Sequence, residues 1–529
     1  IAPLALYNDW CERFFDSILE SATKTALAAE QPAQVVPGAA EGAAAVPPAN
    51  RQPQHDRLLF NYIVEAPSFP PSFISKFQEC LVNPRTARMG IATLRDVIAL
   101  RPPVRREGLR LLIANSSCLD SGIRTACIIA VKKHHGDHTL TPWMEKLALE
   151  SFRDGLKSAA KQFEELDASV KDIENPPDHP MEGDETAATA AAAPEDPKAL
   201  AAKARAQGES NIYERVLRRS QLFLALCTRN AALISKILEV YAESTPQVQA
   251  MIRFHIKPMV QSLSHNPAKV LPVLRTYPPG ADPMVLRIVE VLTLHTVPSK
   301  ELVQTVIDIY LERKTSPRII AFVLNGMTRE QLARYLPDVV AMMNNTDPMG
   351  LVVAMAFERL TTSYQGRPSC MSPTELLVAL HAKPVYETGI KSAEGAVGLC
   401  IDRDAVFSPQ ILAAAVKMLL EQDEVSPLLL RTGILCHKKH RSTAGLINRM
   451  LNTLVERRVW QMQDDVWKGF VLCCFELLPA TFKVMFALPY DRLKEAVEIE
   501  PRLVGPLQGY TSKLPRGSLR NQYKWLLEL

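Results

Sequence analysis

Apolar residues recur along this chain with the spacing of an amphipathic α-helix. In residues 408–422 they fall four apart in two adjacent stripes, and residues 302–311 repeat the arrangement. Such a stripe covers one face of a helix. Residues 372–375 read Ser-Pro-Thr-Glu, which is a capping box with proline at the first helical position. The pattern therefore predicts helices in all three segments.

The same start signal recurs along much of the chain. A Ser, Thr, Asp or Asn precedes proline at positions 141, 245, 266, 282, 316, 347, 372, 408 and 426. From position 245 onward the intervals cluster near ~18 residues or near twice that, which fits one helix with its turn, or a helix pair. Helix pairs with a period of this order are typical of HEAT and armadillo proteins. We predict an all-α fold, a HEAT/armadillo-like α-solenoid of antiparallel helix pairs with two disordered linkers.

Composition divides the chain into helical blocks and linkers. Two stretches are rich in Ala and Pro, and the second has seven acids and no Lys or Arg between residues 174 and 197. Such segments bury too little apolar surface to order themselves. The expected organisation is a docking helix at 1–22, a disordered linker at 23–55, a HEAT-like helical block at 56–173, an acidic Ala/Pro-rich linker at 174–208 with a short helix at 198–206, and a longer helical-repeat domain at 209–529.

Residue counts narrow the class of protein further. There are only 22 Gly but 39 Pro, which disfavours the hairpin turns of an all-β fold. No apolar run reaches the ~18 residues of a membrane span, so we expect no membrane contact. The chain begins with Ile1, and we expect it to be a piece of a longer protein. The ten Cys form no C-x-x-C pair, and we interpret them as reduced, buried thiols.

A search for catalytic chemistry finds no complete set of residues. The chain lacks a P-loop, a dinucleotide fingerprint, a zinc-protease motif and a nucleophile elbow. The run at 134–138, His-His-Gly-Asp-His, is interpreted as a basic helix end and loop rather than a metal site. The run at 436–440, Cys-His-Lys-Lys-His, is interpreted as a solvated loop between helices, since no second Cys or His pair lies near it. We predict no enzyme activity, no cofactor and no metal.

The strongest charge feature lies between residues 431 and 458. Seven Lys and Arg stand there against one acid, Glu456, which gives a local net charge of +6. Two interpretations remain open: cations at helix ends, favoured by the helix dipole, or a surface for acidic protein or RNA phosphate. Few aromatics are present to stack bases, so RNA contact is expected to be weak or indirect at most. The candidate partner-binding residues are Arg431, Lys438, Lys439, Arg441, Arg457, Arg458, Trp460, Trp467 and Phe470.

Several short segments in the second half occur in an order that resembles a known family. They are Val323–Met327 (VLNGM), Glu375–His381 (ELLVALH), Leu429–Thr432 (LLRT), Val466–Cys474 (VWKGFVLCC), Phe482–Val484, Ala487–Pro489, Pro501–Leu503 and Pro506–Leu507. Over residues 222–529 this order and spacing resemble the C-terminal half of the symplekin family, also known as Pta. Around Cys436–Arg441 the chain departs from the family pattern, where a proline-containing turn is usual.

The resemblance implies a non-catalytic scaffold of the nuclear pre-mRNA 3′-end cleavage and polyadenylation complex. The implied partners are the nuclease subunit of the cleavage and polyadenylation specificity factor and its inactive paralogue, together with the cleavage stimulation factor. The phosphatase-binding N-terminal HEAT domain of the family is expected to be missing from this piece. The alternative is a HEAT-repeat adaptor of nuclear transport or of a vesicle coat.

Overall fold

The computed structural model contains helices as its only regular elements within the described residues. The residues that the structure describes are 2–30, 54–66, 72–174, 197–363 and 368–513, the short helix at 525–528, and the single residues 70, 366 and 523. The predicted all-α class is confirmed. The chain divides into two compact units, residues 1–284 and 285–529. The assignment of the helices to HEAT or armadillo repeats stays a prediction.

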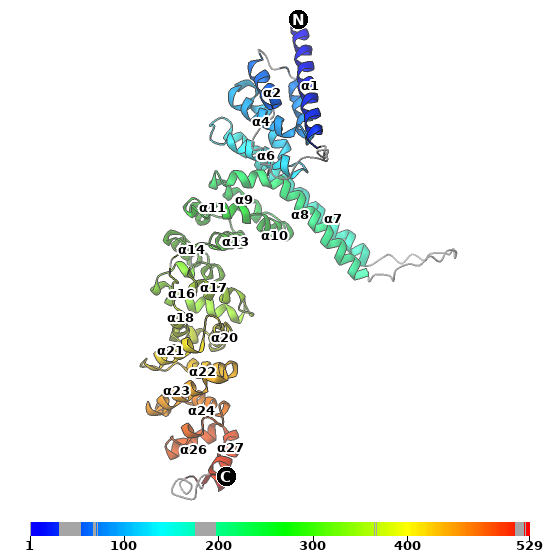
Figure 1. The fold of residues 1–529 in the computed structure, drawn as a ribbon. Coiled ribbons are helices and arrows are strands. Elements are labelled where there is room, and N and C mark those ends of the chain that lie inside the picture. Colours follow the sequence, from blue (N-terminus) through cyan, green and yellow to red (C-terminus); the bar gives the residue numbers. More distant parts are fainter. Residues whose placement is uncertain are drawn as a thin grey trace, which may run out of the picture. The chain divides into compact units, whose positions relative to one another are not determined.

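The first unit contains twelve α-helices in its described part (Figure 1). They are α1 (Ala2–Glu30), α2 (Gln54–Glu65), α3 (Ser72–Val82), α4 (Ala87–Leu100), α5 (Arg105–Asn115), α6 (Ser121–Lys133), α7 (Thr141–Glu174), α8 (Pro197–Cys227), α9 (Ile234–Ala242), α10 (Pro246–His255), α11 (Lys257–Leu263) and α12 (Leu271–Arg275). Helix α13 (Asp282–Leu292) begins in this unit and ends in the second.

The described α-helices that lie wholly in the second unit are each shorter than α1, α7 and α8. They are α14 (Lys300–Arg313), α15 (Arg318–Ala321), α16 (Arg329–Ala341), α17 (Leu351–Thr361), α18 (Pro373–Leu380), α19 (Lys383–Thr388), α20 (Ile390–Ile401), α21 (Pro409–Leu420), α22 (Pro427–Lys439), α23 (Ala444–Glu456), α24 (Asp464–Glu476), α25 (Phe482–Met485), α26 (Tyr490–Ile499), α27 (Val504–Ser512) and α29 (Trp525–Glu528).

Helix starts in the second unit follow the Ser-Pro signals of the sequence. Ser372 makes both bonds of the predicted capping box, accepting from the Glu375 backbone and donating its own N–H to the Glu375 carboxylate. Helices α18, α21 and α22 each begin with proline directly after a serine. Proline suits this position because the first N–H groups of a helix have no intrahelical acceptor.

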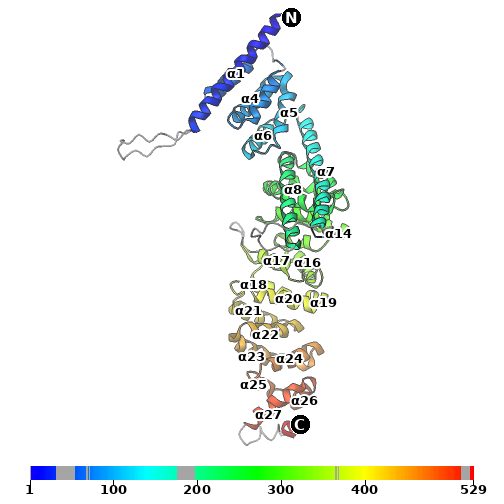
Figure 2. The same cartoon turned by 90° about the vertical axis from the view of Figure 1, so that its right-hand side faces the viewer.

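The helices of the second unit stack in two layers. One layer runs through α20, α22, α24 and α26, and the other through α18, α21, α23 and α25, with each helix contacting the next in its own layer. Figure 2 shows this succession along the unit. The core lies between the layers and includes the fully buried side chains of Leu428, Leu451 and Phe470. This nearest-neighbour stacking is the packing mode of α-solenoids.

Helices α7 and α8 form a long antiparallel hairpin in the first unit (Figure 2). Phe152 stacks on Phe223 near one end at 5.2 Å between ring centroids, and Asp167 pairs with Arg205 at 3.1 Å near the other. As the residue number rises along α7, that of its partner on α8 falls. The hairpin therefore joins the block predicted at 56–173 to residues assigned to the following linker and domain.

Both predicted linkers extend too far into helical sequence. Residues 23–30 are the last two turns of α1, and residues 197–208 are the first turns of α8, longer than the short helix expected at 198–206. Alanine, the best helix former, is frequent in both segments, and Ala201 is fully buried. The remainder of the two linkers, residues 31–53 and 175–196, lies outside the described residues.

Helix α1 packs on α2 and α3 through one face. Phe15 is fully buried, with its ring 5.2 Å from Phe73 and 5.3 Å from Phe77, and Ile18 is also buried. Trp10 of the same helix is exposed. The contact is aromatic, and such pairs add to the free energy of apolar burial.

Candidate partner-binding surface

The seven cations between residues 431 and 458 lie on two helices and their connections. They come from α22, from the 3-10 turn Arg441–Thr443, from α23 and from the residues that follow it. The solvated loop predicted at 436–440 is wrong for its first four residues, because α22 continues to Lys439 and Cys436 is buried. An apolar stripe that reaches Cys436 supplies the packing for this last turn.

Three of these cations are paired with acids on neighbouring elements. Arg431 contacts Glu394 of α20 at 2.7 Å, Lys438 contacts Glu476 of α24 at 3.6 Å, and Lys439 contacts Asp402 at 3.0 Å. The hydrogen bond from Lys439 to Asp402 raises the pKa of the lysine ammonium. The local +6 of the sequence is therefore partly neutralised by residues far away in the chain.

The Arg457 side chain holds the end of a neighbouring helix. Its guanidinium donates to the carbonyl of Leu420 at 2.7 Å and to that of Asp423 at 2.8 Å, just where α21 ends. Such bonds satisfy carbonyls that have no partner within the helix, and they complement its dipole. Arg457 is therefore a cation at a helix end, the first of the two interpretations of the basic stretch.

The other cations of the stretch face solvent. Arg441, Arg449 and Arg458 are exposed and make no ion pair with any described residue. Arg458 has a left-handed backbone, φ 55°, at the start of the 3-10 turn Val459–Gln461. Within the stretch, the cations without an acidic partner among the described residues are therefore these three arginines and Arg457, whose partners are neutral carbonyls.

Two of the three predicted aromatic anchors belong to the core. Trp467 is only 4% exposed and stacks on the fully buried Phe470 with 5.6 Å between ring centroids. The indole Nε1 of Trp467 donates to Glu495 at 3.0 Å. These side chains cannot reach a partner while the unit is folded, so assigning them to a partner surface is wrong. They are buried because α24 carries apolar residues on most of its circumference and contacts both α22 and α26.

Trp460 remains accessible. It is half-buried and lies in the 3-10 turn before α24, so it does not share a continuous helical face with Trp467. Of the predicted aromatic anchors, only Trp460 retains a surface that a partner could cover.

A groove between α20, α22 and α24 was not predicted from the sequence. Its volume is about 470 Å³, and its lining combines apolar side chains with the Arg431–Glu394 and Lys438–Glu476 pairs. The lining residues are Ile390, Glu394, Pro427, Leu430, Arg431, Ile434, Leu435, Lys438, Asp465, Lys468, Gly469, Leu472 and Glu476. Only Arg431 and Lys438 were among the predicted site residues.

The groove lining includes accessible apolar side chains. Leu472 of α24 is 40% exposed, and Leu435 of α22 is half-buried. Gly469 lets these helices approach, because a Cβ at this position would lie 3.1 Å from Leu430 Cδ1. The sequence could not single out Leu472, because it sits among core residues and only the packing of α24 decides which of them stays exposed.

The thiols near this surface are unsuited to nucleophilic chemistry. Burial raises the pKa of Cys436 and of Cys473 to about 12, and it raises that of Cys474 well above its ordinary value. A thiol that stays protonated at neutral pH is a poor nucleophile and a poor metal ligand. No three His, Cys, Asp or Glu side chains of the described residues are arranged to hold a metal ion. Within the same residues, every helix is too short or too polar to cross a membrane.

Segments that carried the family resemblance meet in the structure. His381 ends one of them, and Thr432 ends another, and the His381 Nε2 lies 2.8 Å from the Thr432 hydroxyl. The His381 Nδ1 faces the carbonyl of Leu377 at 2.7 Å, so this nitrogen carries the proton. Burial lowers the pKa of His381 to about 4, although the Leu377 carbonyl opposes the shift. His381 is therefore a neutral, buried connection between α18 and α22.

These features define a class of protein. A layered all-α unit whose surface presents a groove lined by apolar side chains and ion pairs suits binding of other proteins. Residues 316–500 match the family described as Symplekin tight junction protein C terminal. This part of the chain belongs to the C-terminal region of the symplekin family, which confirms the resemblance. No solved structure matches the chain.

The match is narrower than the resemblance predicted from the sequence. It includes the segments from Val323–Met327 to Ala487–Pro489, whereas Pro501–Leu503 and Pro506–Leu507 follow it. The family is one of generally non-enzymatic scaffolds in nuclear mRNA processing. The groove and the whole basic stretch, residues 431–458, lie inside the matched residues.

Proposed function

We propose that this chain is a scaffold subunit of the nuclear pre-mRNA 3′-end cleavage and polyadenylation complex. Its second unit binds the endonuclease module, formed by the nuclease subunit of the cleavage and polyadenylation specificity factor and its inactive paralogue. It also links this module to the cleavage stimulation factor. The family match supports the general role, and the groove between α20, α22 and α24 is the observation that carries the binding surface.

The chemistry of the groove specifies the segment that it binds. The exposed Leu472 and the half-buried Leu435 offer apolar area in its lining, which also carries charges of both signs. An amphipathic helix or strand with two or three apolar side chains flanked by charged residues fits this arrangement. Apolar burial supplies most of the affinity, and the charges of the lining set the orientation of the segment and its association rate.

The exposed arginines extend this surface. Arg441, Arg449 and Arg458 attract an acidic partner over a distance comparable to the Debye length, ~8–10 Å at physiological salt. Steering by such charges changes the association rate more than the lifetime of a complex. The basic stretch therefore acts as a guide towards the groove, and RNA contact is not part of this proposal.

A pair of matched variants tests the groove. Leu472→Glu places a charge in the groove lining, whereas Leu311→Glu changes a leucine of the same unit that is 51% exposed on α14. Both substitutions leave the core intact. Against the purified nuclease subunit and its paralogue, Leu472→Glu should raise Kd about tenfold or more, as expected for an apolar contact of the groove. Leu311→Glu should leave Kd within about twofold. Equal affinities for both variants would show that the groove is not the docking site.

A charge variant tests the steering by the arginines. Changing Arg441 and Arg458 together to Glu should slow association and flatten its salt dependence, with little effect on dissociation. Stopped-flow or surface-based kinetics at low and high salt would measure both rates. A change in dissociation alone would contradict a steering role and would place these side chains inside the interface.

A further inference from the structure

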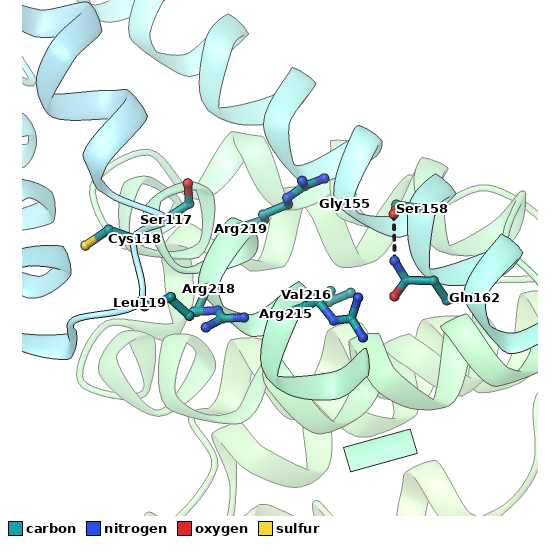
Figure 3. A pocket seen from close by; sticks show the side chains of 10 residues that line it. All are labelled: Ser117, Cys118, Leu119, Gly155, Ser158, Gln162, Arg215, Val216, Arg218 and Arg219. Carbon is teal, nitrogen blue, oxygen red and sulfur yellow. Dashed lines mark hydrogen bonds between the residues drawn. The ribbon is translucent and has the colours of Figure 1, made fainter. Parts of the chain in front are cut away.

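A second cavity lies in the first unit, outside the residues that match the family. Its volume is about 360 Å³, and it is bounded by α7, α8 and the turn after α5. Figure 3 shows the lining residues Ser117, Cys118, Leu119, Gly155, Ser158, Gln162, Arg215, Val216, Arg218 and Arg219. Three of them are arginines of α8, and none is an acid, so the lining has a charge of +3.

The positive charge of this cavity is poorly compensated. The Arg218 side chain is only 15% exposed, and its nearest carboxylate, on the exposed Glu214, is 3.8 Å away. Arg215 makes one long bond, 3.5 Å, from Nε to the carbonyl of Asn211. Arg219 has no hydrogen-bond or ion-pair partner among the described residues. A largely buried guanidinium without a close anion is costly, and a bound anion would repay that cost.

The helix packing holds one arginine in place. A Cβ at Gly155 would lie 3.2 Å from Arg219 Cβ and 3.3 Å from its Cδ, so the aliphatic stem of Arg219 lies across this glycine. A larger residue on α7 would displace the stem. The side chain therefore enters the cavity with part of its conformational freedom already removed, which favours binding.

Both walls of the cavity are held by hydrogen bonds. Arg124 of α6 donates to the carbonyls of Cys118 at 2.7 Å and Leu119 at 3.0 Å, and its Nε donates to Gln221 of α8 at 2.7 Å. These bonds fix the turn against α8. On the other wall, Gln162 donates to the Ser158 hydroxyl at 3.1 Å, which leaves the hydroxyl proton available for an acceptor in the cavity.

The guanidinium groups indicate the shape of the ligand. In Figure 3 they spread along the cavity between the 117–119 turn and the Ser158–Gln162 pair, and they do not meet at one point. This spacing suits several anions on one chain better than a single phosphate. No aromatic side chain lines the cavity to stack a base, which disfavours single-stranded RNA. Guanidinium groups match carboxylates in bidentate geometry.

We propose that this cavity binds an extended acidic peptide of a partner protein. The carboxylates of its Asp or Glu residues pair with Arg215, Arg218 and Arg219, and Ser158 donates a further hydrogen bond. The site is distinct from the groove of the second unit. The chain would thereby bind two partners: one through the apolar contacts of the groove, and a second whose carboxylates enter this cavity.

Binding of a fluorescein-labelled oligoglutamate to the full chain tests this proposal. Arg215→Glu combined with Arg219→Glu should raise Kd about tenfold or more, since charge-assisted hydrogen bonds are lost. Arg106→Glu makes the same kind of charge change at an exposed arginine of α5 that does not line the cavity, and should change Kd about twofold or less. Arg219→Gln, which keeps the stem over Gly155, should still weaken binding.

Three results would overturn the proposal. First, the Arg215→Glu, Arg219→Glu double variant could bind oligoglutamate as tightly as the parent protein and melt at the same temperature. The Arg106→Glu control could weaken binding as much as the cavity variants, which would mean general charge attraction. Finally, a labelled oligouridine could bind more tightly than oligoglutamate and be the ligand that the cavity variants lose, which would make RNA the occupant.

Discussion

Protonation of His381 should make the second unit less stable in mild acid. The folded-state pKa of His381 is about 4, while an unfolded histidine titrates near ~6.5. Above the unfolded value both states are neutral at this site, and the full stability is present. As pH falls from ~6.5 towards about 4, only the unfolded state takes up the proton, so the free energy of unfolding falls.

The size of this effect follows from the two pKa values. Each pH unit between them costs about 1.4 kcal/mol, so the loss is about 2 kcal/mol at pH 5 and approaches about 3 kcal/mol near pH 4. The imidazole is fully buried and its two nitrogens face only the Leu377 carbonyl and the Thr432 hydroxyl. Among the described residues, no acid is in hydrogen-bonding contact with the ring to favour its charged form.

Comparison with a variant isolates this histidine from other titrating groups. His381→Gln keeps a polar side chain but cannot titrate. Denaturant unfolding at pH 7 and pH 5, with hydrogen exchange of peptides from α18 and α22, gives the local free energy of opening. The parent should lose about 2 kcal/mol more between the two pH values than the variant. Equal losses would show that His381 does not titrate on unfolding and would refute the reasoning.

Two further substitutions test packing contacts, one within each unit. Gly326→Ala should destabilise the second unit by about 1–3 kcal/mol, because the new Cβ would lie 2.8 Å from the backbone oxygen of Pro298. A thermal melt measures this loss, and an unchanged melting temperature would contradict the close approach. Phe15→Ala should lower the free energy of unfolding by about 3–5 kcal/mol and release α1 from α3. Labelling of the buried Cys11 by a thiol reagent would detect this release. Continued protection of Cys11 would show that α1 is held by other contacts.

The helical class and many helix starts could be predicted from local sequence. Helix α18 is an example: its cap at Ser372, its proline and its apolar spacing all act within one turn or two of the chain. The same holds for α21 and α22, whose first turns follow Ser-Pro pairs. Local signals suffice here because capping bonds and helix propensity depend on residues close in sequence.

The extent of the linkers could not be predicted, because composition and packing favour different outcomes. Residues 197–208 look like part of a polar, Ala-rich linker, yet they continue into α8, where Ala201 is fully buried. Burial against α7 stabilises these residues as a helix, and no property of the segment itself reveals this contribution. Tertiary contacts commonly override compositional expectation in this way.

The binding surface depended most on the tertiary structure. The sequence by itself determined that the region from 431 to 458 is basic and that a strongly apolar segment follows it. Only the folded unit decided that Trp467 lies in the core, that Lys438 is paired with Glu476, and that Leu472 remains exposed in a groove. Charge pairing and exposure are set by neighbouring helices distant in sequence, so a local pattern specifies which side chains are present but not which of them a partner can reach.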